Sequence, residues 1–106
     1  MKIITLCGSL RFQREMMTIA EKMALKGHCI LTPVYSVSKN IDRTKEQLIN
    51  LKEAHLKRIE LSDAILVVNV NNYIGNSTNF EIDYAKKLGK EIIYYTDLIE
   101  NKCNFY

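Results

Sequence analysis

Residues 64–70 read AILVVNV, a run of seven residues that is apolar throughout except for Asn69. A continuous apolar run without alternation is typical of a parallel strand that helices cover on both faces. Three other runs have the composition of strands, and they occupy residues 2–7, 28–34 and 91–96. Between the runs lie segments with apolar residues at helical spacing, over residues 12–26, 44–61 and 77–88. The chain therefore alternates strand and helix.

This alternation predicts the fold class. Strands separated by helices pair in parallel through right-handed crossovers. With four strands we expect an α/β fold of flavodoxin-like or Rossmann-like type. It would be a three-layer sandwich in which a four-stranded parallel sheet of order 2-1-3-4 carries helices on both faces. In that order the winding reverses between strands one and three, and open α/β sheets bind ligands at such a point.

Length and composition indicate one ordinary globular domain over residues 1–106. The chain is 47% hydrophobic and 25% charged, and its size suits a single core. The net charge of +3 comes from basic residues interspersed with acidic ones, which does not favour nucleic-acid binding. No apolar run is long enough to cross a membrane.

The cysteines point to a reducing compartment. Cys7, Cys29 and Cys103 are odd in number and lack the paired spacing of a disulfide framework or a zinc site. We therefore expect a cytoplasmic protein without a structural metal. The loop over residues 35–43 has no periodicity, and its length suits a segment that covers a ligand.

Two loops lie where ligands are expected. The first is Gly8-Ser9-Leu10-Arg11, in which glycine permits close approach of a ligand and Ser9 and Arg11 suit phosphate or sugar oxygens. The alternative for Ser9 is a cap of the following helix. The second loop runs over residues 71–81 and places Gly75 and Ser77 just before a helix. Its spacing favours a capping box between Thr78 and Glu81.

Other polar residues are ambiguous. His55 shares an apolar helical stripe, which favours a partly buried histidine, although its position suits the ligand end of the sheet. Asp63 is expected at the opposite edge of the sheet, and Asp83 is expected to point outward. Cys7 ends the first strand, where burial is a better expectation than a role as nucleophile.

Three stretches match a known pattern in order and spacing and together span most of the chain. They are residues 4–11 (ITLCGSLR), 61–70 (LSDAILVVNV) and 73–85 (YIGNSTNFEIDYA), followed by Gly89-Lys90. In these stretches the chain resembles the nucleoside 2-deoxyribosyltransferase superfamily, which includes the 2'-deoxynucleoside 5'-phosphate N-hydrolases. The resemblance identifies residues 1–106 as a domain of this kind.

The resemblance implies an activity that needs no metal or cofactor. Glu81 would attack the anomeric carbon of a 2-deoxyribosyl group and expel the nucleobase with retention of configuration. This role replaces the capping interpretation of Glu81. The implied ligands of the sugar or its 5'-phosphate are Gly8, Ser9, Arg11, Gly75 and Ser77.

One position departs from the pattern. Eight residues before Asp63, where the superfamily has an aspartate, this chain has His55, whose ordinary pKa lies near neutrality. The resemblance implies that this position serves as an acid–base group or as a sugar contact. The loop before Glu81 is also about two residues longer than in the N-hydrolases.

Three hypotheses follow. The first is a retaining N-glycosidase or transglycosidase of deoxynucleosides or their monophosphates, with a small-molecule nucleoside or nucleotide as its partner. The second is a nucleotide-binding or sensing module of the same fold without turnover. The third is a partner-binding protein that uses the helix over residues 44–61. Because this helix is longer than the sheet is high, we expect a homodimer, with the site completed across the interface as the resemblance implies.

Overall fold

The computed structural model of the chain describes residues 1–36 and 42–99. The strands in these ranges are β1 (Ile3–Cys7), β2 (Cys29–Leu31), β3 (Ala64–Val67) and β4 (Glu91–Tyr94). The α-helices are α1 (Gln13–Leu25), α2 (Lys45–Leu61), α3 (Asn76–Lys87) and α4 (Tyr95–Ile99). Two 3-10 helices are η1 (Leu10–Phe12) and η2 (Val70–Asn72). The order of the four strands and of α1 to α3 is the one that the sequence predicts, whereas α4 and the two 3-10 helices are additional.

The sheet is parallel throughout and has the order β2-β1-β3-β4, which confirms the predicted topology. β1 and β3 form its centre, paired from Ile4 with Ala64 to Cys7 with Val67. Because these two strands neighbour one another although they are not consecutive, the winding reverses between them. The reversal point lies at their carboxyl ends.

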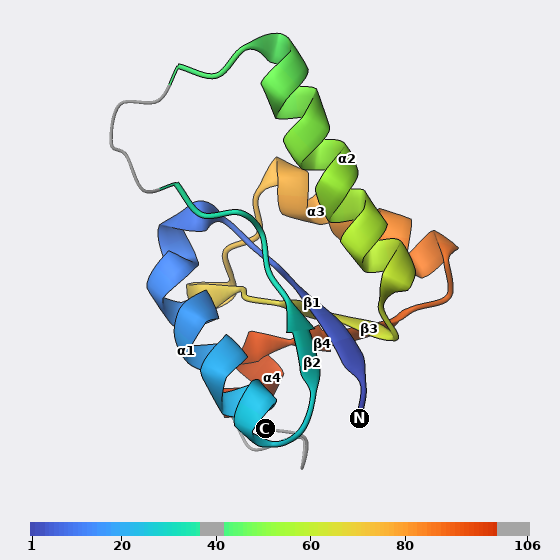
Figure 1. Cartoon of the computed structure of the whole chain (residues 1–106). Helices are drawn as coiled ribbons and strands as arrows, with labels where there is room; N and C mark the ends of the chain where they lie inside the picture. The colour runs from blue at the N-terminus through green and yellow to red at the C-terminus, as the bar shows by residue number, and fades with distance from the viewer. Residues whose placement is uncertain (37–41, 100–106) are drawn as a thin grey trace.

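Helices cover both faces of the sheet, with α1 and α4 on one side and α2 and α3 on the other (Figure 1). Each face has its own buried cluster. In β3, Leu66 packs in the cluster of α1 and α4, whereas Ile65 and Val67 pack in the cluster of α2 and α3. The strand is thus buried on both faces, as its uninterrupted apolar run predicts.

The ends of three strands differ from the prediction. β2 ends at Leu31 instead of residue 34. β3 ends at Val67 instead of residue 70, because the chain turns into η2 with Asn71 and Asn72 at positive φ, a conformation that asparagine tolerates. β4 ends at Tyr94 instead of residue 96, because α4 begins at the next residue. Asn69, the polar residue in the apolar run, accepts from the Thr96 amide at 3.2 Å and thereby fixes this second turn.

α2 begins with a capping box in which Thr44 and Gln47 exchange hydrogen bonds. Its first half extends beyond the sheet (Figure 1), and its buried residues, His55 and Ile59, both lie in the second half. The predicted apolar stripe therefore packs over part of its length, and Leu48 is 53% exposed.

Within residues 1–36 and 42–99, no helix combines the length and the apolar character needed to cross a membrane. The expected cover over the ligand at residues 35–43 falls largely on residues 37–41, outside the described ranges.

Ile65 tests the double-sided burial of β3. Its side chain is fully buried, so Ile65→Ala should lower the free energy of unfolding by about 2–5 kcal/mol through lost burial and a residual cavity. The measurement is urea denaturation followed by circular dichroism. Leu25→Ala is the matched control, because Leu25 is 82% exposed, and it should change the free energy by less than about 0.5 kcal/mol. Equal losses in the two variants would contradict this packing.

Candidate active site

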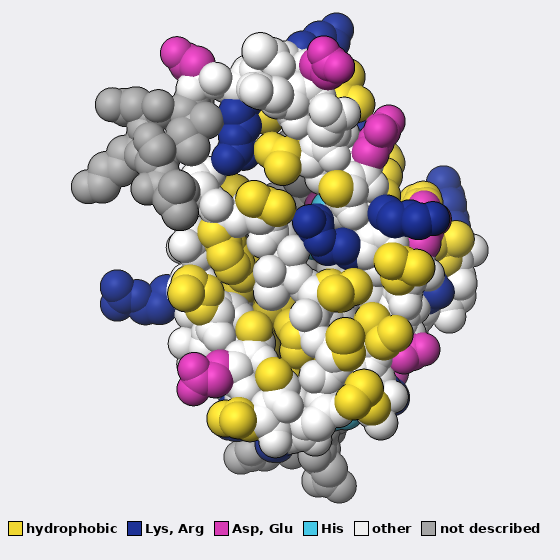
Figure 2. Space-filling view, viewed as in Figure 1, with side chains coloured by type: hydrophobic (Ala, Val, Ile, Leu, Met, Phe, Trp, Pro, Cys, Tyr) yellow, Lys and Arg dark blue, Asp and Glu magenta, His cyan; other side chains and the backbone are white. Residues whose placement is uncertain are grey.

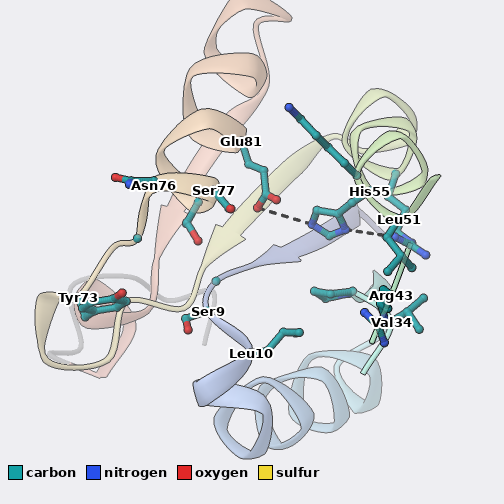
Figure 3. A pocket seen from close by; sticks show the side chains of 16 residues that line it. Ser9, Leu10, Val34, Arg43, Leu51, His55, Tyr73, Asn76, Ser77 and Glu81 are labelled. Carbon is teal, nitrogen blue, oxygen red and sulfur yellow. Dashed lines mark hydrogen bonds and ion pairs between the residues drawn. The ribbon is translucent and has the colours of Figure 1, made fainter. Parts of the chain in front are cut away.

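A cleft with a volume of about 460 Å³ lies at the carboxyl ends of β1 and β3, where the winding reverses (Figure 3). One wall comes from the loop after β1 and the other from α2 and the start of α3. Of the residues that the sequence singled out as catalytic or binding, six line it: Gly8, Ser9, His55, Gly75, Ser77 and Glu81. The structure therefore brings these six residues together at one cleft.

The loop after β1 passes close to the end of β3. A Cβ atom on Gly8 would lie 3.2 Å from the Val68 carbonyl oxygen, so glycine is what lets the two backbones approach here. Ser9 accepts a hydrogen bond from the Arg11 amide at 3.3 Å and caps η1. Ser9 also lines the cleft, so its capping hydrogen bond leaves it at the cleft surface.

The start of α3 forms the opposite side of the cleft. The helix begins at Asn76 with Gly75 as its N-cap, and no side chain caps its first turn. The predicted capping box between Thr78 and Glu81 is wrong, because both residues lie inside the helix. The uncapped amides and the dipole of this helix end favour an anionic or oxygen-rich ligand in the cleft.

Glu81 points into the cleft toward His55 (Figure 3). Its Oε1 atom lies 3.8 Å from His55 Nε2, and 19% of its side chain is exposed. Burial raises the pKa of Glu81 to about 7, and a hydrogen bond from Cys7 acts in the opposite direction. At neutral pH the carboxyl group therefore occurs in both its protonated and its ionised form.

His55 belongs to α2, and its side chain is buried against the end of β1. Its pKa is lowered to about 4, first by burial and then by the positive charge of Arg58, while a hydrogen bond with the Leu6 backbone opposes the shift. The imidazole is therefore neutral at pH 7. Its Nδ1 atom faces Arg58 Nη1 at 3.2 Å, and its Nε2 atom lies 3.7 Å from Cys7 Sγ.

Cys7 is a site residue whose contacts the sequence did not reveal. It is fully buried, as expected, and its pKa is raised by burial and by the neighbouring Glu81 charge. In the sequence, the signal that could have identified Cys7 as a site residue was its position at the end of β1, beside the Gly8-Ser9 turn. The thiol therefore stays protonated at neutral pH and is a poor nucleophile.

The basic residues of the cleft also differ from those expected. Arg11 does not line it, because its guanidinium lies 4.1 Å from the centre of the Tyr73 ring and bonds the Tyr73 hydroxyl at 3.3 Å. The cationic residues among the lining are Arg43, Lys52 and Arg58. Figure 2 shows Lys and Arg side chains bordering the hollow on this face. A spacing of three residues between Lys52, His55 and Arg58 was the available signal in the sequence.

Two further aspartates lie where the sequence predicts. Asp63 accepts a hydrogen bond from the Ile3 amide at 2.8 Å, at the edge of the sheet opposite the cleft. Asp83 is exposed on α3. Glu81 is therefore the one acidic residue among the described residues that line the cleft.

Cys7, His55 and Glu81 also have the residue types of a metal site, and their donor atoms lie within 4.8 Å of one another. A histidine that binds a metal through one nitrogen normally donates its other N–H to an acceptor. Here the other nitrogen of His55 faces Arg58, whose guanidinium is a donor and never an acceptor. The arrangement therefore suits a neutral hydrogen-bonded cluster better than a bound cation.

Comparisons with known proteins complete the description. No family model and no curated protein match the sequence. The fold is similar to that of the solved 2-deoxyribosyltransferase from Leishmania mexicana, with a TM-score of 0.66 and 22% identity over 90% of this chain. The two proteins share a fold. The chain spans 64% of the length of that transferase, so activity has to be argued from the cleft itself.

Glu81→Gln tests the burial of the carboxyl group. With a pKa of about 7 in the folded protein and 4.5 unfolded, Glu81 binds more protons in the folded state between these values. The stability that it contributes is present below pH 4.5 and is lost as the pH rises through 7. From pH 5 to pH 8 the variant should therefore gain roughly 2 kcal/mol of stability relative to the unmodified protein in urea denaturation.

His55→Asn is the matched control with the opposite sign. Because the pKa of His55 is lowered from 6.5 to about 4, its contribution is present above pH 6.5 and is lost as the pH falls through 4. This variant should gain relative stability toward acid. A stability difference for Glu81→Gln that stays constant with pH would contradict the buried position of the carboxyl group.

Proposed function

We propose that residues 1–106 form a nucleoside 2-deoxyribosyltransferase-like domain that cleaves or transfers the N-glycosidic bond of 2'-deoxynucleosides or their 5'-monophosphates. Glu81 is the nucleophile. The observation that carries the proposal is the Glu81 carboxylate, which faces the cleft at the winding reversal beside His55. The shared fold with a deoxyribosyltransferase supports the reaction class.

The chemistry proceeds with retention in two displacements. Glu81 forms a bond to C1' of the sugar while the C1'–N bond breaks, and the electron pair leaves with the base, which takes a proton from water in the open cleft. A water molecule, or a second base, then attacks C1' and regenerates the carboxylate. Attack by water gives hydrolysis, and attack by a base gives transfer.

His55 contacts the nucleophile and the sugar in this mechanism instead of protonating the base. With a pKa of about 4 it carries no spare proton at pH 7, which makes it a poor general acid. As a neutral imidazole beside Glu81 it provides a polar contact without adding charge. The acid–base alternative for this position is therefore the weaker one.

The charge of the cleft favours the 5'-monophosphate over the nucleoside. Gly8, Ser9, Gly75 and Ser77 present amides and hydroxyls from two loops that suit sugar and phosphate oxygens. Three cations, Arg43, Lys52 and Arg58, line the same cleft against the single carboxylate of Glu81. We assign Arg11 a supporting role through its contact with Tyr73.

A binding or sensing module without turnover is the second candidate. The raised pKa of Glu81 favours it, because a carboxyl group protonated in about half of the molecules at neutral pH is a weak nucleophile. The same cleft then recognises a nucleotide and leaves the bond intact. The two candidates differ in product formation and agree in ligand binding.

Turnover separates these candidates. The purified protein is incubated with the four deoxynucleosides and their 5'-monophosphates, with and without a free acceptor base, and base release or exchange is followed by chromatography. We expect turnover that is faster with monophosphates and that falls by at least about 10³-fold in Glu81→Ala. Asp83→Ala, at an exposed site on the same helix, is the control. A nucleotide-dependent thermal shift without any product would instead establish the binding module.

The outer surface of α2 supports a homodimer. Leu48 and Ile49 are 53% and 45% exposed on the half of the helix that extends beyond the sheet. This surface is adjacent to the cleft, because Leu51 and Lys52 of the same helix line it. A second copy placed here would complete the cleft. The free thiols Cys7 and Cys29 agree with a reducing, cytoplasmic location.

Light scattering at micromolar concentration tests the homodimer. We expect the mass of two chains for the unmodified protein and a monomer for Leu48→Lys, because a charge at this position opposes burial in the interface. Leu25→Lys, which alters an exposed leucine on α1, should remain dimeric. A monomeric unmodified protein would refute the proposal, and capture of a different partner by α2 would favour the partner-binding hypothesis.

A further inference from the structure

We propose that Arg58, His55 and Cys7 form a one-directional hydrogen-bond chain that ends on the Glu81 carboxylate and makes Arg58 and Cys7 positioning residues for the nucleophile. The proposal rests on the proposed function and assigns a task to Cys7, which the reaction itself does not use, and a second task to Arg58, which also lines the cleft as a cation. The hydrogen-bond chain crosses three elements. Arg58 and His55 belong to α2, Cys7 belongs to β1 and Glu81 belongs to α3.

The direction of the chain is fixed at its first link. Arg58 Nη1 lies 3.2 Å from His55 Nδ1, and a guanidinium only donates hydrogen bonds. Nδ1 therefore accepts and carries no proton. Because the imidazole is neutral at pH 7, its single proton is held on Nε2.

The second and third links follow from this tautomer. Nε2 lies 3.7 Å from Cys7 Sγ, so the imidazole donates and the sulfur accepts. The thiol is then left to donate its own hydrogen to Glu81, and this hydrogen bond lowers the pKa of the carboxyl group against the effect of burial. Nε2 also lies 3.8 Å from Glu81 Oε1, so the imidazole stands beside the same carboxylate.

The end of the chain fixes the same direction independently. When Glu81 is ionised, its carboxylate only accepts hydrogen bonds, so in that state the donor-only group at one end and the acceptor-only group at the other agree on one direction. The charged and titratable groups that face Glu81 are Cys7 of β1 and His55, Lys52 and Arg58 of α2, with Arg43 from the segment before α2. Among them, the Cys7 thiol and the His55 imidazole have atoms within 4.8 Å of the carboxylate.

Nuclear magnetic resonance of the imidazole nitrogens tests the first link without any need for turnover. The ¹⁵N-labelled His28→Gln variant leaves His55 as the single histidine of the chain. At pH 7 we expect the proton of His55 on Nε2, and in the additional variant Arg58→Met we expect a mixture of tautomers. A proton on Nδ1 while Arg58 is present would overturn the proposal.

The pH dependence of Glu81 tests the last link. Cys7→Ala removes the donor and should shift the acidic limb of the pH–rate profile upward by about one pH unit, whereas Cys7→Ser retains a donor and should restore most of the limb. An Ala variant with the same limb as the unmodified protein would overturn the proposal. If the protein has no turnover, the ¹³C resonance of the Glu81 carboxyl group gives the same pKa directly, so failure of the function and failure of the chain remain distinguishable.

Arg58 requires variants that separate its charge from its donor. Arg58→Gln removes the charge and keeps an N–H donor for Nδ1, and Arg58→Met removes both. The proposal expects the acidic limb to move upward by a larger amount in the Met variant, and equal shifts in the two would show that charge alone acts. Lys57→Met is the control: it removes a neighbouring exposed charge that pairs with Glu60, and it should leave the limb in place.

Discussion

The position and shape of the cleft depend on the parallel pairing of β1 with β3. The two strands run in register to Cys7 and Val67, and beyond these residues the chain leaves toward opposite faces of the sheet, to α1 after β1 and to α3 after β3. The space between the diverging segments is the cleft. It exists only because the backbones remain close at its floor, where Gly8 stands against Val68. A larger residue at this point would widen the floor and separate the two loops that share the ligand.

Burial at this floor acts on the two titratable groups in opposite directions. Removal from water disfavours charge, so it raises the pKa of Glu81 to about 7 and lowers that of His55 to about 4. The ion pair that their separation of 3.8 Å permits is therefore not the dominant state at neutral pH. The pair is better described as a neutral imidazole beside a carboxyl group whose ionisation depends on its hydrogen-bond donors. This makes the surroundings of Glu81 decisive for its reactivity.

The sequence predicts the sheet and most of the cleft because both depend on local patterns. The uninterrupted run of β3, the helical spacing and the glycine turns are enough to place Ser9, Ser77 and Glu81 at one edge. The direction in which a side chain points depends on tertiary contacts, and the sequence predicts it less well. Thr78 and Glu81 have the spacing of a capping box, but α3 begins at Asn76, so neither residue is at the cap. Arg11 belongs to the loop in sequence, but its guanidinium stacks on the Tyr73 ring and does not line the cleft.

A neutral histidine at position 55 has an electrostatic consequence for the cleft. A second carboxylate at the place of His55 would put two like charges in a poorly hydrated cleft and raise the pKa of Glu81 still further. Neutral His55 avoids that repulsion and leaves the cations of the cleft uncompensated except by Glu81. Their charge is then available to an anionic substrate, while the ionisation of Glu81 is governed by uncharged donors. Arg43 and Lys52 thus add positive charge to the cleft, Cys7 and His55 surround the Glu81 carboxyl group, and Arg58 takes part in both.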